Sequence, residues 1–299
     1  MPADLSGAIE RDRAAIEARL GEVLAPPDGS LGLLFEAMAY ATLGGGKRLR
    51  GFLVMEGARL ADAPADAALN AAAAIECIHA YSLVHDDLPA MDDDDLRRGK
   101  PTTHIEFGED VAILVGDGLQ ALAFELIAAI GGMSGVDPLS VIRLSGALAA
   151  AAGPMGMVGG QMWDMAMERS DGAPDDPRAT IEGIQRLKTG ALFEWSAQAG
   201  PILAGADRAP LAAYARALGR AFQVHDDLLD VVSTAEEMGK AVGKDAGRGK
   251  ITFVSELGEA GARAEAERLV DEAVAALDPY GEKAQTLRDL ARFVIDRRN

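Results

Sequence analysis

The chain has 299 residues, about half of them hydrophobic, and a formal net charge of −18 at pH 7. Aromatic residues make up only 5%, and the alternating Val, Ile and Thr runs that mark β-sheets are scarce, so the composition predicts an all-α chain. The acidic balance disfavours nucleic acid and anionic membrane surfaces as partners, because like charges repel. No stretch of about 18 uncharged apolar residues occurs, so no membrane insertion is expected.

Cys77 is the only cysteine. An intrachain disulfide is therefore excluded, which fits a reducing cytosol and predicts a cytoplasmic location. Cys77 lies in an apolar helical run, where a buried structural thiol is expected. No linker is long or polar enough to separate domains, so a single domain over residues 1–299 is predicted.

Apolar periodicity and the Gly and Pro breakers predict a series of helices. The first covers about 5–24 and the second 31–43, where three glycines at 44–46 end it. Further helices are expected at 47–60, 66–87, 110–130, 138–152, 155–168, 180–199, 209–232 and 261–277, with a last one near the C-terminus. Breaks are expected at 131–137, 170–178 and 200–210. The Gly-rich basic segment 238–250 is a candidate loop that closes over an anion.

The pentapeptide Val-His-Asp-Asp-Leu occurs at 84–88 and again at 224–228, each time after a long apolar helix. Asp226 and Asp230 share one helix face, where like charges destabilise the helix unless a cation neutralises them. Asp86 and Asp87 lie at the C-terminal end of a helix, where the helix dipole disfavours negative charge. Four more carboxylates follow at 92–95, of which 93–95 are expected to be solvated turn residues. Oxygen ligands of this kind favour Mg²⁺ over zinc or calcium.

Basic residues lie beside these carboxylates. The glycine turn at 44–46 precedes Lys47 and Arg50, which share a face at a helix start, where backbone N–H groups favour an anion; exposed first-turn bases are the alternative. Arg97 and Arg98 follow the first aspartate run directly. Acidic and basic clusters this close together indicate a metal–diphosphate site.

All four histidines lie in or beside the charged motifs. His79 comes seven residues before Asp86 and shares its helix face. Its ordinary alternative is a satisfied core or surface residue.

Taken together, these motifs resemble those of the trans-polyprenyl diphosphate synthases. Asp-Asp-x4-Asp at 86–92 with Arg97-Arg98-Gly99 is similar to the family's first aspartate-rich motif, and Asp226-Asp227-x-x-Asp230 is similar to the second. The remaining signatures follow in family order at 45–50, 188–190, 222–223 and 239–240. The resemblance covers about 30–260, and six motifs in order are specific. It implies an all-α isoprenoid synthase fold, with helices around a deep cavity, and a homodimer.

The resemblance also implies roles for individual residues. Three Mg²⁺ ions, with Mn²⁺ as a substitute, are expected on Asp86, Asp92 and Asp226, with Asp87, Asp227 and Asp230 close by. The allylic diphosphate is expected on Arg97, Lys188 and Lys240, and isopentenyl diphosphate on Lys47, Arg50, His79 and Arg98. Thr189 and Gln223 would point polar atoms at the reacting carbons. Lys250 matches a basic position in the closing loop, and Arg297 or Arg298 is a candidate C-terminal base.

The implied activity is condensation of isopentenyl diphosphate with dimethylallyl or geranyl diphosphate, by ionisation, condensation and elimination. Tyr81 and Ser82 lie about one turn before Asp86, where a large aromatic side chain would stop a growing product. Tyr81 with the Pro89-Ala90 insertion resembles bacterial farnesyl (C15) synthases. A geranylgeranyl (C20) product is the alternative, in which case Tyr81 is ordinary core.

Two rival functions fit parts of the sequence. A terpene cyclase shares the fold, but it would not need the second diphosphate site formed by Lys47, Arg50 and His79. A non-enzymatic, cation-binding helical scaffold would not need arginines beside the aspartates. The motifs therefore favour the prenyltransferase.

Overall fold

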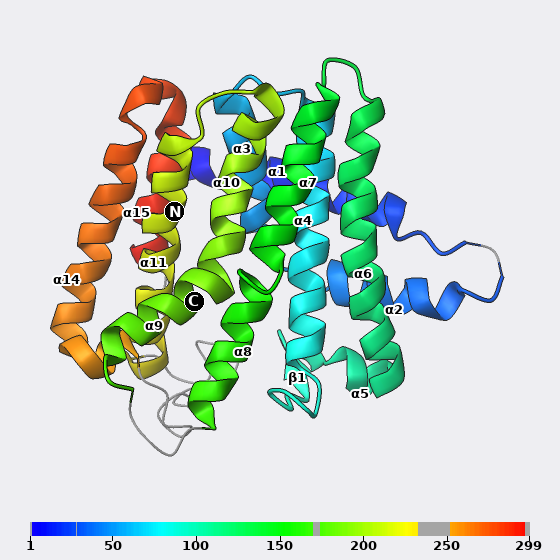
Figure 1. Cartoon of the computed structure of the whole chain (residues 1–299), viewed down its shortest axis with the longest axis horizontal. Helices are drawn as coiled ribbons and strands as arrows, with labels where there is room; N and C mark the ends of the chain where they lie inside the picture. The colour runs from blue at the N-terminus through cyan, green and yellow to red at the C-terminus, as the bar shows by residue number, and fades with distance from the viewer. Residues whose placement is uncertain (1, 28, 170–173, 233–251, 297–299) are drawn as a thin grey trace. The chain divides into compact units, whose positions relative to one another are not determined.

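The computed structural model describes residues 2–27, 29–169, 174–232 and 252–296 (Figure 1). Within these ranges the strands are two antiparallel two-residue segments, β1 (Leu96–Arg97) and β2 (Lys100–Pro101), and helices make up most of the rest. The prediction of an all-α chain is confirmed. The chain forms two compact units. The N-terminal unit comprises 6–145 and 199–205, and the C-terminal unit comprises the described residues of 1–5, 146–198 and 206–299. The single domain over 1–299 stays a prediction.

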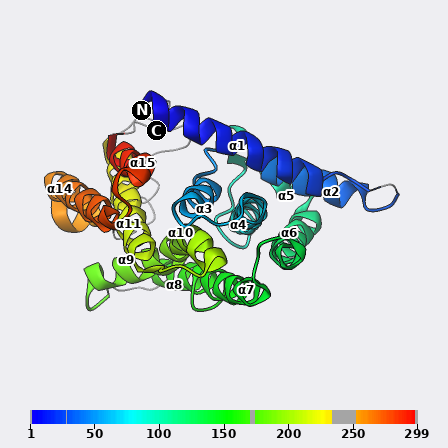
Figure 2. The same ribbon diagram turned by 90° about the horizontal axis from the view of Figure 1, so that it is seen from above.

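The N-terminal unit is built around a helix that is buried along most of its length. This central helix is α4 (Ala65–Asp86), in which every residue from 71 to 78 is buried. Its run of alanines lets neighbouring helices approach closely, and α4 packs against α3 (Leu49–Leu60) and α6 (Glu109–Ala129) (Figure 2). The other elements here are α1 (Ala3–Val23), α2 (Gly32–Leu43), α5 (Thr103–Phe107) and the short 3-10 turn η1 (Ile130–Gly132). Cys77 is fully buried in α4, as predicted.

The core of the C-terminal unit is formed by α11 (Ala209–Val232), α14 (Phe253–Ala276) and α15 (Gln285–Asp296) (Figure 1). Tyr214 of α11 is fully buried, and its hydroxyl donates to the Leu287 carbonyl of α15 at 2.8 Å. The 3-10 segment η3 (Asp278–Ala284) joins the last two helices. This unit also holds α8 (Met157–Glu168), α9 (Pro177–Gln185) and the π-helical turn η2 (Arg186–Gly190). Three of the described helices have residues in both units: α1, α7 (Pro138–Ala152) and α10 (Ala191–Ala204).

Most predicted helices have the expected bounds, and three differences have local causes. The single helix expected at 180–199 is wrong: α9 begins at Pro177, with Asp176 accepting from the Ala179 amide at 2.9 Å, and η2 separates α9 from α10. The break expected from 200 is wrong up to 204, because α10 continues through Pro201. The helix expected at 261 begins at 253 instead, where Thr252 forms a capping box, and it is kinked at Gly258.

Among the described residues, three helical stretches are long and apolar enough to cross a membrane by length and composition alone: Ala65–Asp86, Glu109–Gly132 and Pro138–Glu168. The most apolar window of the first is 78% buried, so its hydropathy is that of a core helix. The corresponding windows of the second and third are only 39% and 33% buried. The absence of membrane insertion stays a prediction, and the exposed apolar surface of these two stretches requires another explanation.

Candidate functional site

The first aspartate motif begins at the last residue of α4. Asp86 is half-buried there, and its carbonyl accepts from the Asp92 amide at 2.8 Å. The Asp93 amide donates to the Leu88 carbonyl at 3.2 Å, and Asp93 has a φ of 53°. The loop therefore folds back on the helix end and brings the backbone of Asp92 beside that of Asp86, six residues earlier.

Asp87, next to Asp86, faces an arginine. Its carboxylate is buried and accepts from Arg97 Nε at 2.8 and 2.9 Å and from Arg97 Nη2 at 2.5 Å. Burial raises the pKa of Asp87, and the Arg97 guanidinium opposes that shift. A bidentate pair of this kind fixes the orientation of the guanidinium plane. Asp87 thus anchors Arg97, and its expected role beside the metal stays a prediction.

The glycine turn before α3 is organised by two other arginines. Gly45 and Gly46 have φ values of 103° and 118°, where a side chain would be strained. Arg98 Nη1 donates to the Gly45 carbonyl, and a Cβ on Gly46 would lie 2.9 Å from the same nitrogen. Arg48 is buried and donates to the Thr42 carbonyl at 2.7 Å. The glycines thus make room for the guanidinium of Arg98.

A buried carboxylate on α4 completes this arrangement. Glu76 accepts from the Gly51 amide at 2.9 Å, which satisfies an N–H group in the first turn of α3. Arg48 Nη1 lies 3.5 Å from Glu76 Oε2, and both side chains are buried. The sequence interpretation did not single out either residue. Glu76 was overlooked because its partners lie far from it in the chain.

His79 lies one turn after Glu76 among four arginines. Burial lowers the pKa of His79 well below its ordinary value, and Arg50, Arg98, Arg97 and Arg48 lower it further. Burial also lowers the pKa of Arg50 to about 10. His79 is therefore neutral near pH 7, while the arginines supply the positive charge. Lys47, which is exposed, belongs to the same turn.

A small pocket of about 50 Å³ lies beside the Asp87–Arg97 pair. Arg98, Tyr40 and Leu83 are among the residues that line it. The guanidinium groups of Arg97 and Arg98 thus line this pocket together with apolar side chains. This region of the N-terminal unit is suited to hold an anion.

Tyr81 and Ser82 occupy different environments on α4. Tyr81 is buried and packs edge to face against His85, with ring centroids 5.8 Å apart. A Cβ on Gly116 of α6 would lie 2.0 Å from His85 Nε2, so this glycine admits the imidazole. Ser82 is half-buried and donates to the His79 carbonyl at 2.8 Å. Their expected role in product length stays a prediction.

The second aspartate motif lies near the end of α11 in the C-terminal unit. Asp226 and Asp227 are half-buried, and Asp227 Oδ2 accepts from the Phe253 amide at 2.9 Å. Asp227 thereby ties α11 to the first turn of α14. Gln223 is half-buried one turn earlier. Asp230 lies in the helix, but its side chain is outside the described part of the chain.

Lys188 and Thr189 lie in the π-helical turn η2 and are half-buried. Lys188 Nζ donates to Asp164 Oδ2 of α8 at 2.8 Å. The sequence interpretation did not single out Asp164, because its partner Lys188 lies 24 residues away in the chain. Four predicted basic residues lie outside the described residues: Lys240, Lys250, Arg297 and Arg298.

Within the described ranges, no three His, Cys, Asp or Glu side chains form a group that could hold a metal ion by themselves. Mg²⁺ ordinarily takes only one or two carboxylates and completes its coordination with water and substrate phosphate. The Asp86–Asp92 pair provides hard oxygen donors of this number. These residues therefore fit Mg²⁺ better than an ion that needs a full protein cage.

Comparison with known proteins agrees with the motifs. The family model "Polyprenyl synthetase" matches residues 32–289. The chain is 44% identical over 270 residues to farnesyl diphosphate synthase of Escherichia coli K12, covering 88% of each chain. It is 41% identical over 276 residues to geranylgeranyl diphosphate synthase of Cyanophora paradoxa, covering 91% of this chain and 90% of the relative.

A solved structure shares the fold. The FPP/GFPP synthase of Zymomonas mobilis superposes with a TM-score of 0.87 at 45% identity, over 99% of this chain and 100% of the other. The predicted isoprenoid synthase fold is confirmed by this likeness. Because the family model spans most of the sequence and the relatives exceed 40% identity over nearly their whole length, the chain belongs to the polyprenyl synthetase family.

Proposed function

We propose that the protein is a short-chain prenyltransferase that condenses isopentenyl diphosphate with dimethylallyl or geranyl diphosphate and yields farnesyl diphosphate. The observation that supports the proposal is a pair of charged clusters in the N-terminal unit. Asp86 and Asp92 lie together at the end of α4, while arginines surround His79 earlier on the same helix. We expect the first cluster to bind phosphate through a cation and the second to bind it directly.

The carboxylates of Asp86, Asp92 and Asp226 would hold the three expected Mg²⁺ ions, with Mn²⁺ as a substitute. When bound, the metal neutralises charge on the departing diphosphate. Arg97 and Lys188 would bind the same diphosphate, together with Lys240. Arg97 is already oriented by Asp87, so its guanidinium needs little rearrangement to bind phosphate oxygens.

The second diphosphate would be held by bases alone: Lys47, Arg50, His79 and Arg98. Because His79 is neutral near pH 7, it would contribute a hydrogen bond while the arginines contribute charge. A diphosphate bound without a metal is not activated to leave, so the homoallylic substrate keeps its own. Thr189 and Gln223 would orient polar atoms toward the reacting carbons.

Tyr81 supports the C15 product. It is buried on α4 five residues before Asp86, which is about 7.5 Å along the helix axis. A ring at that depth would block a chain growing along the helix. Relatives include both farnesyl and geranylgeranyl diphosphate synthases, so the C20 product is the second candidate.

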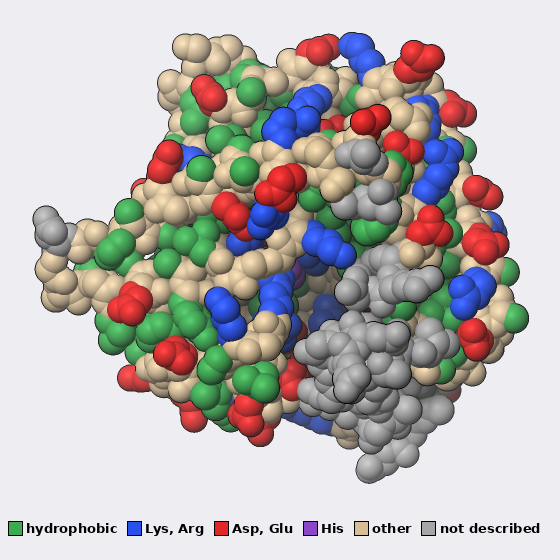
Figure 3. Space-filling model, turned by 180° about the vertical axis from the view of Figure 1, so that it is seen from behind, with side chains coloured by type: hydrophobic (Ala, Val, Ile, Leu, Met, Phe, Trp, Pro, Cys, Tyr) green, Lys and Arg blue, Asp and Glu red, His purple; other side chains and the backbone are tan. Residues whose placement is uncertain are grey.

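A homodimer is the assembly that we propose. Ile113 and Leu114 of α6 and Ile105 of α5 are exposed, and Leu114 is 56% exposed. Hydrophobic side chains also gather on the face that carries α2 and α5 (Figure 3). A second copy would cover such a surface, and light scattering would measure the mass. We also propose a cytoplasmic location, in keeping with the single buried thiol.

Incubation with dimethylallyl and isopentenyl diphosphates and Mg²⁺, followed by chromatography, tests the activity. A C15 diphosphate is the expected product, and chelation of Mg²⁺ is expected to abolish it. A hydrocarbon formed from one substrate would indicate a cyclase instead. No turnover of either substrate would indicate a scaffold.

A further inference from the structure

The π-helical turn that carries Lys188 is pressed against one face of α8. A Cβ added to Gly160 of α8 would lie 2.2 Å from the Lys188 amide nitrogen and 2.7 Å from its Cα. Real Cβ atoms do not approach backbone this closely, so only glycine allows this contact. Asp164 lies four residues later on the same face, and its Oδ2 accepts from Lys188 Nζ at 2.8 Å. One helix face thus fixes both the backbone and the ammonium group of Lys188.

The segment before Lys188 is held by the same helix. A Cβ added to Gly183 of α9 would lie 2.5 Å from Cη2 of Trp163, so the indole ring lies against the α9 backbone. Trp163 is adjacent to Asp164 in α8. Contacts with α8 at Gly183, before the π-helical turn, and at Lys188, within it, therefore hold the turn against α8. Single π-turns inserted between α-helices are rare and often occur at functional sites.

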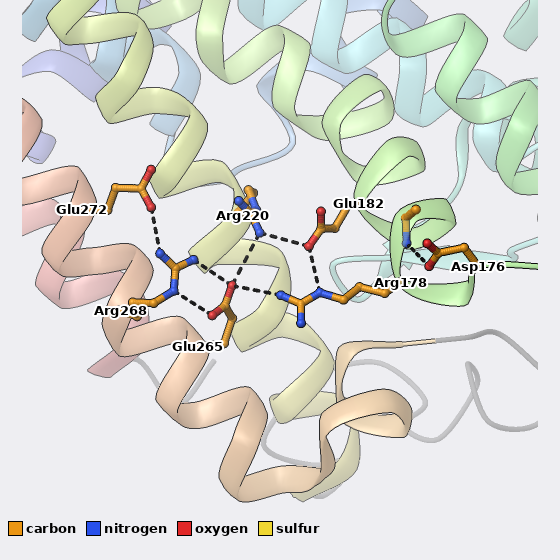
Figure 4. Close-up of polar contacts among 8 residues, drawn as sticks. Asp176, Arg178, Glu182, Arg220, Glu265, Arg268 and Glu272 are labelled. Atoms are coloured by element: carbon orange, nitrogen blue, oxygen red, sulfur yellow. Dashed lines mark hydrogen bonds and ion pairs between the residues drawn. The ribbon is translucent and has the colours of Figure 1, made fainter.

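A charge network fastens the other side of α9. Glu182 Oε1 lies 3.2 Å from Arg178 Nε and 3.1 Å from Arg220 Nη2 of α11. Glu265 of α14 lies 3.5 Å from the same Arg220 nitrogen, and Arg268 joins the network (Figure 4). The backbone that leads into η2 is thus held independently of Asp164. Loss of the Asp164 charge should release the Lys188 side chain and leave its backbone in place.

We infer that Asp164 is the positioning residue for Lys188 in prenyl transfer. The inference rests on the proposed function, in which Lys188 binds the departing diphosphate. A lysine ammonium sits on a flexible four-carbon stem, and a fixed carboxylate confines it before substrate arrives. The two side chains are 27% and 18% exposed, so water screens this pair less than a surface pair.

The inference predicts a distinctive kinetic effect. Preorganised charge acts where negative charge develops in the transition state. Without Asp164, Lys188 still attracts the substrate but no longer stands in place when the C–O bond breaks. The rate constant should therefore fall while substrate affinity persists, because Asp164 no longer competes with the diphosphate for the ammonium.

Steady-state kinetics with geranyl and isopentenyl diphosphates at saturating Mg²⁺ test the inference. For Asp164→Asn we expect kcat to fall about tenfold to hundredfold, as for other groups that orient a site residue, with neither KM raised. Asp164→Glu, which keeps the carboxylate, should recover part of the rate. Glu194→Gln is the matched control, because Glu194 pairs with Arg216 at 2.7 Å in the same unit; it should behave as wild type.

The Lys188→Met variant separates the inference from the function beneath it. In the Lys188→Met background, Asp164→Asn should cause no further fall in kcat, because Asp164 acts through Lys188. If Lys188→Met loses activity while Asp164→Asn keeps the wild-type kcat, the inference is overturned and the proposed function stands. An equal loss from Asp164→Asn in both backgrounds also overturns it. If the wild type makes no diphosphate longer than its substrates, the proposed function is wrong. If Lys188→Met is fully active, the proposed role of Lys188 is wrong.

Discussion

Replacement of Glu76 by Gln removes one charge from the most deeply buried ion pair near the candidate site. Glu76 is 3% exposed, and Arg48, whose Nη1 lies 3.5 Å from Glu76 Oε2, is 6% exposed. Gln keeps an oxygen that can accept from the Gly51 amide. The substitution therefore leaves the helix start satisfied and isolates the effect of the charge.

Removing one partner of a buried pair leaves an uncompensated charge, which costs about 3–5 kcal/mol. Glu17 Oε1 lies 3.5 Å from Arg48 Nε and compensates part of that cost, so we expect about 3 kcal/mol. The comparison is Glu194→Gln, which breaks the more exposed Glu194–Arg216 pair and should cost less than about 1 kcal/mol. The exposed pair is the shorter of the two, at 2.7 Å against 3.5 Å. If Glu76→Gln is nevertheless the more destabilising substitution, burial and not distance determines the loss of stability.

Urea unfolding followed by circular dichroism gives the free energy of unfolding of each variant and of the wild type. A second variant, Arg48→Met combined with Glu76→Gln, removes the stranded charge and should be more stable than Glu76→Gln alone. The reasoning is refuted if Glu76→Gln costs no more than Glu194→Gln, or if the double variant is the less stable of the two.

Further predictions concern three residues of α4. Tyr81→Ala should lengthen the product seen by chromatography, whereas Phe52→Ala, which removes another buried ring, should leave the product length unchanged. A C15 product from Tyr81→Ala would show that Tyr81 does not limit the product length. The pKa of His79 is lower in the folded chain, so the folded state binds fewer protons, and stability should fall as pH drops below about 6.5, by at most about 1.4 kcal/mol per pH unit. His79→Gln should flatten this slope between pH 7.5 and 5.5, and an identical slope would contradict the assignment. Burial raises the pKa of Cys77 to about 12, so a thiol reagent at pH 8 should label it only as urea unfolds the chain, and prompt labelling without urea would count against its burial.

The helix bounds that the sequence predicted well are those set by local chemistry. The expected helices at 138–152 and 209–232 agree with α7 and α11 because Pro138 and Pro210 mark their starts and Gly or polar residues follow their ends. The π-turn at 186–190 could not be predicted in the same way. It depends on the close approach of Gly160 to the Lys188 backbone, and that contact joins segments far apart in the chain.

The candidate site shows the same difference between features set by local sequence and features set by contacts between distant segments. Asp86 and Asp92 could be paired from sequence, because a short loop returns the chain to the helix end. Asp87 and Arg97 were each recognised, but their bidentate contact was not. Asp227 was grouped with the metal ligands, which stays a prediction, and the hydrogen bond that its carboxylate accepts from the Phe253 amide of α14 was not foreseen. Sequence spacing shows which charges share a neighbourhood, while the partner of each charge depends on packing.

These partners bear on how so acidic a chain can bind anionic substrates. Arg97 and Lys188, both proposed to bind the same diphosphate, are each held by a carboxylate, Asp87 and Asp164. Part of the chain's negative charge therefore orients the cations that are proposed to bind phosphate. The opposite arrangement holds around His79, whose pKa is lowered first by burial and then by four arginines. A site with metal-binding carboxylates at one diphosphate and a net excess of bases at the other can activate the first for departure and retain the second, which is the asymmetry that head-to-tail condensation requires.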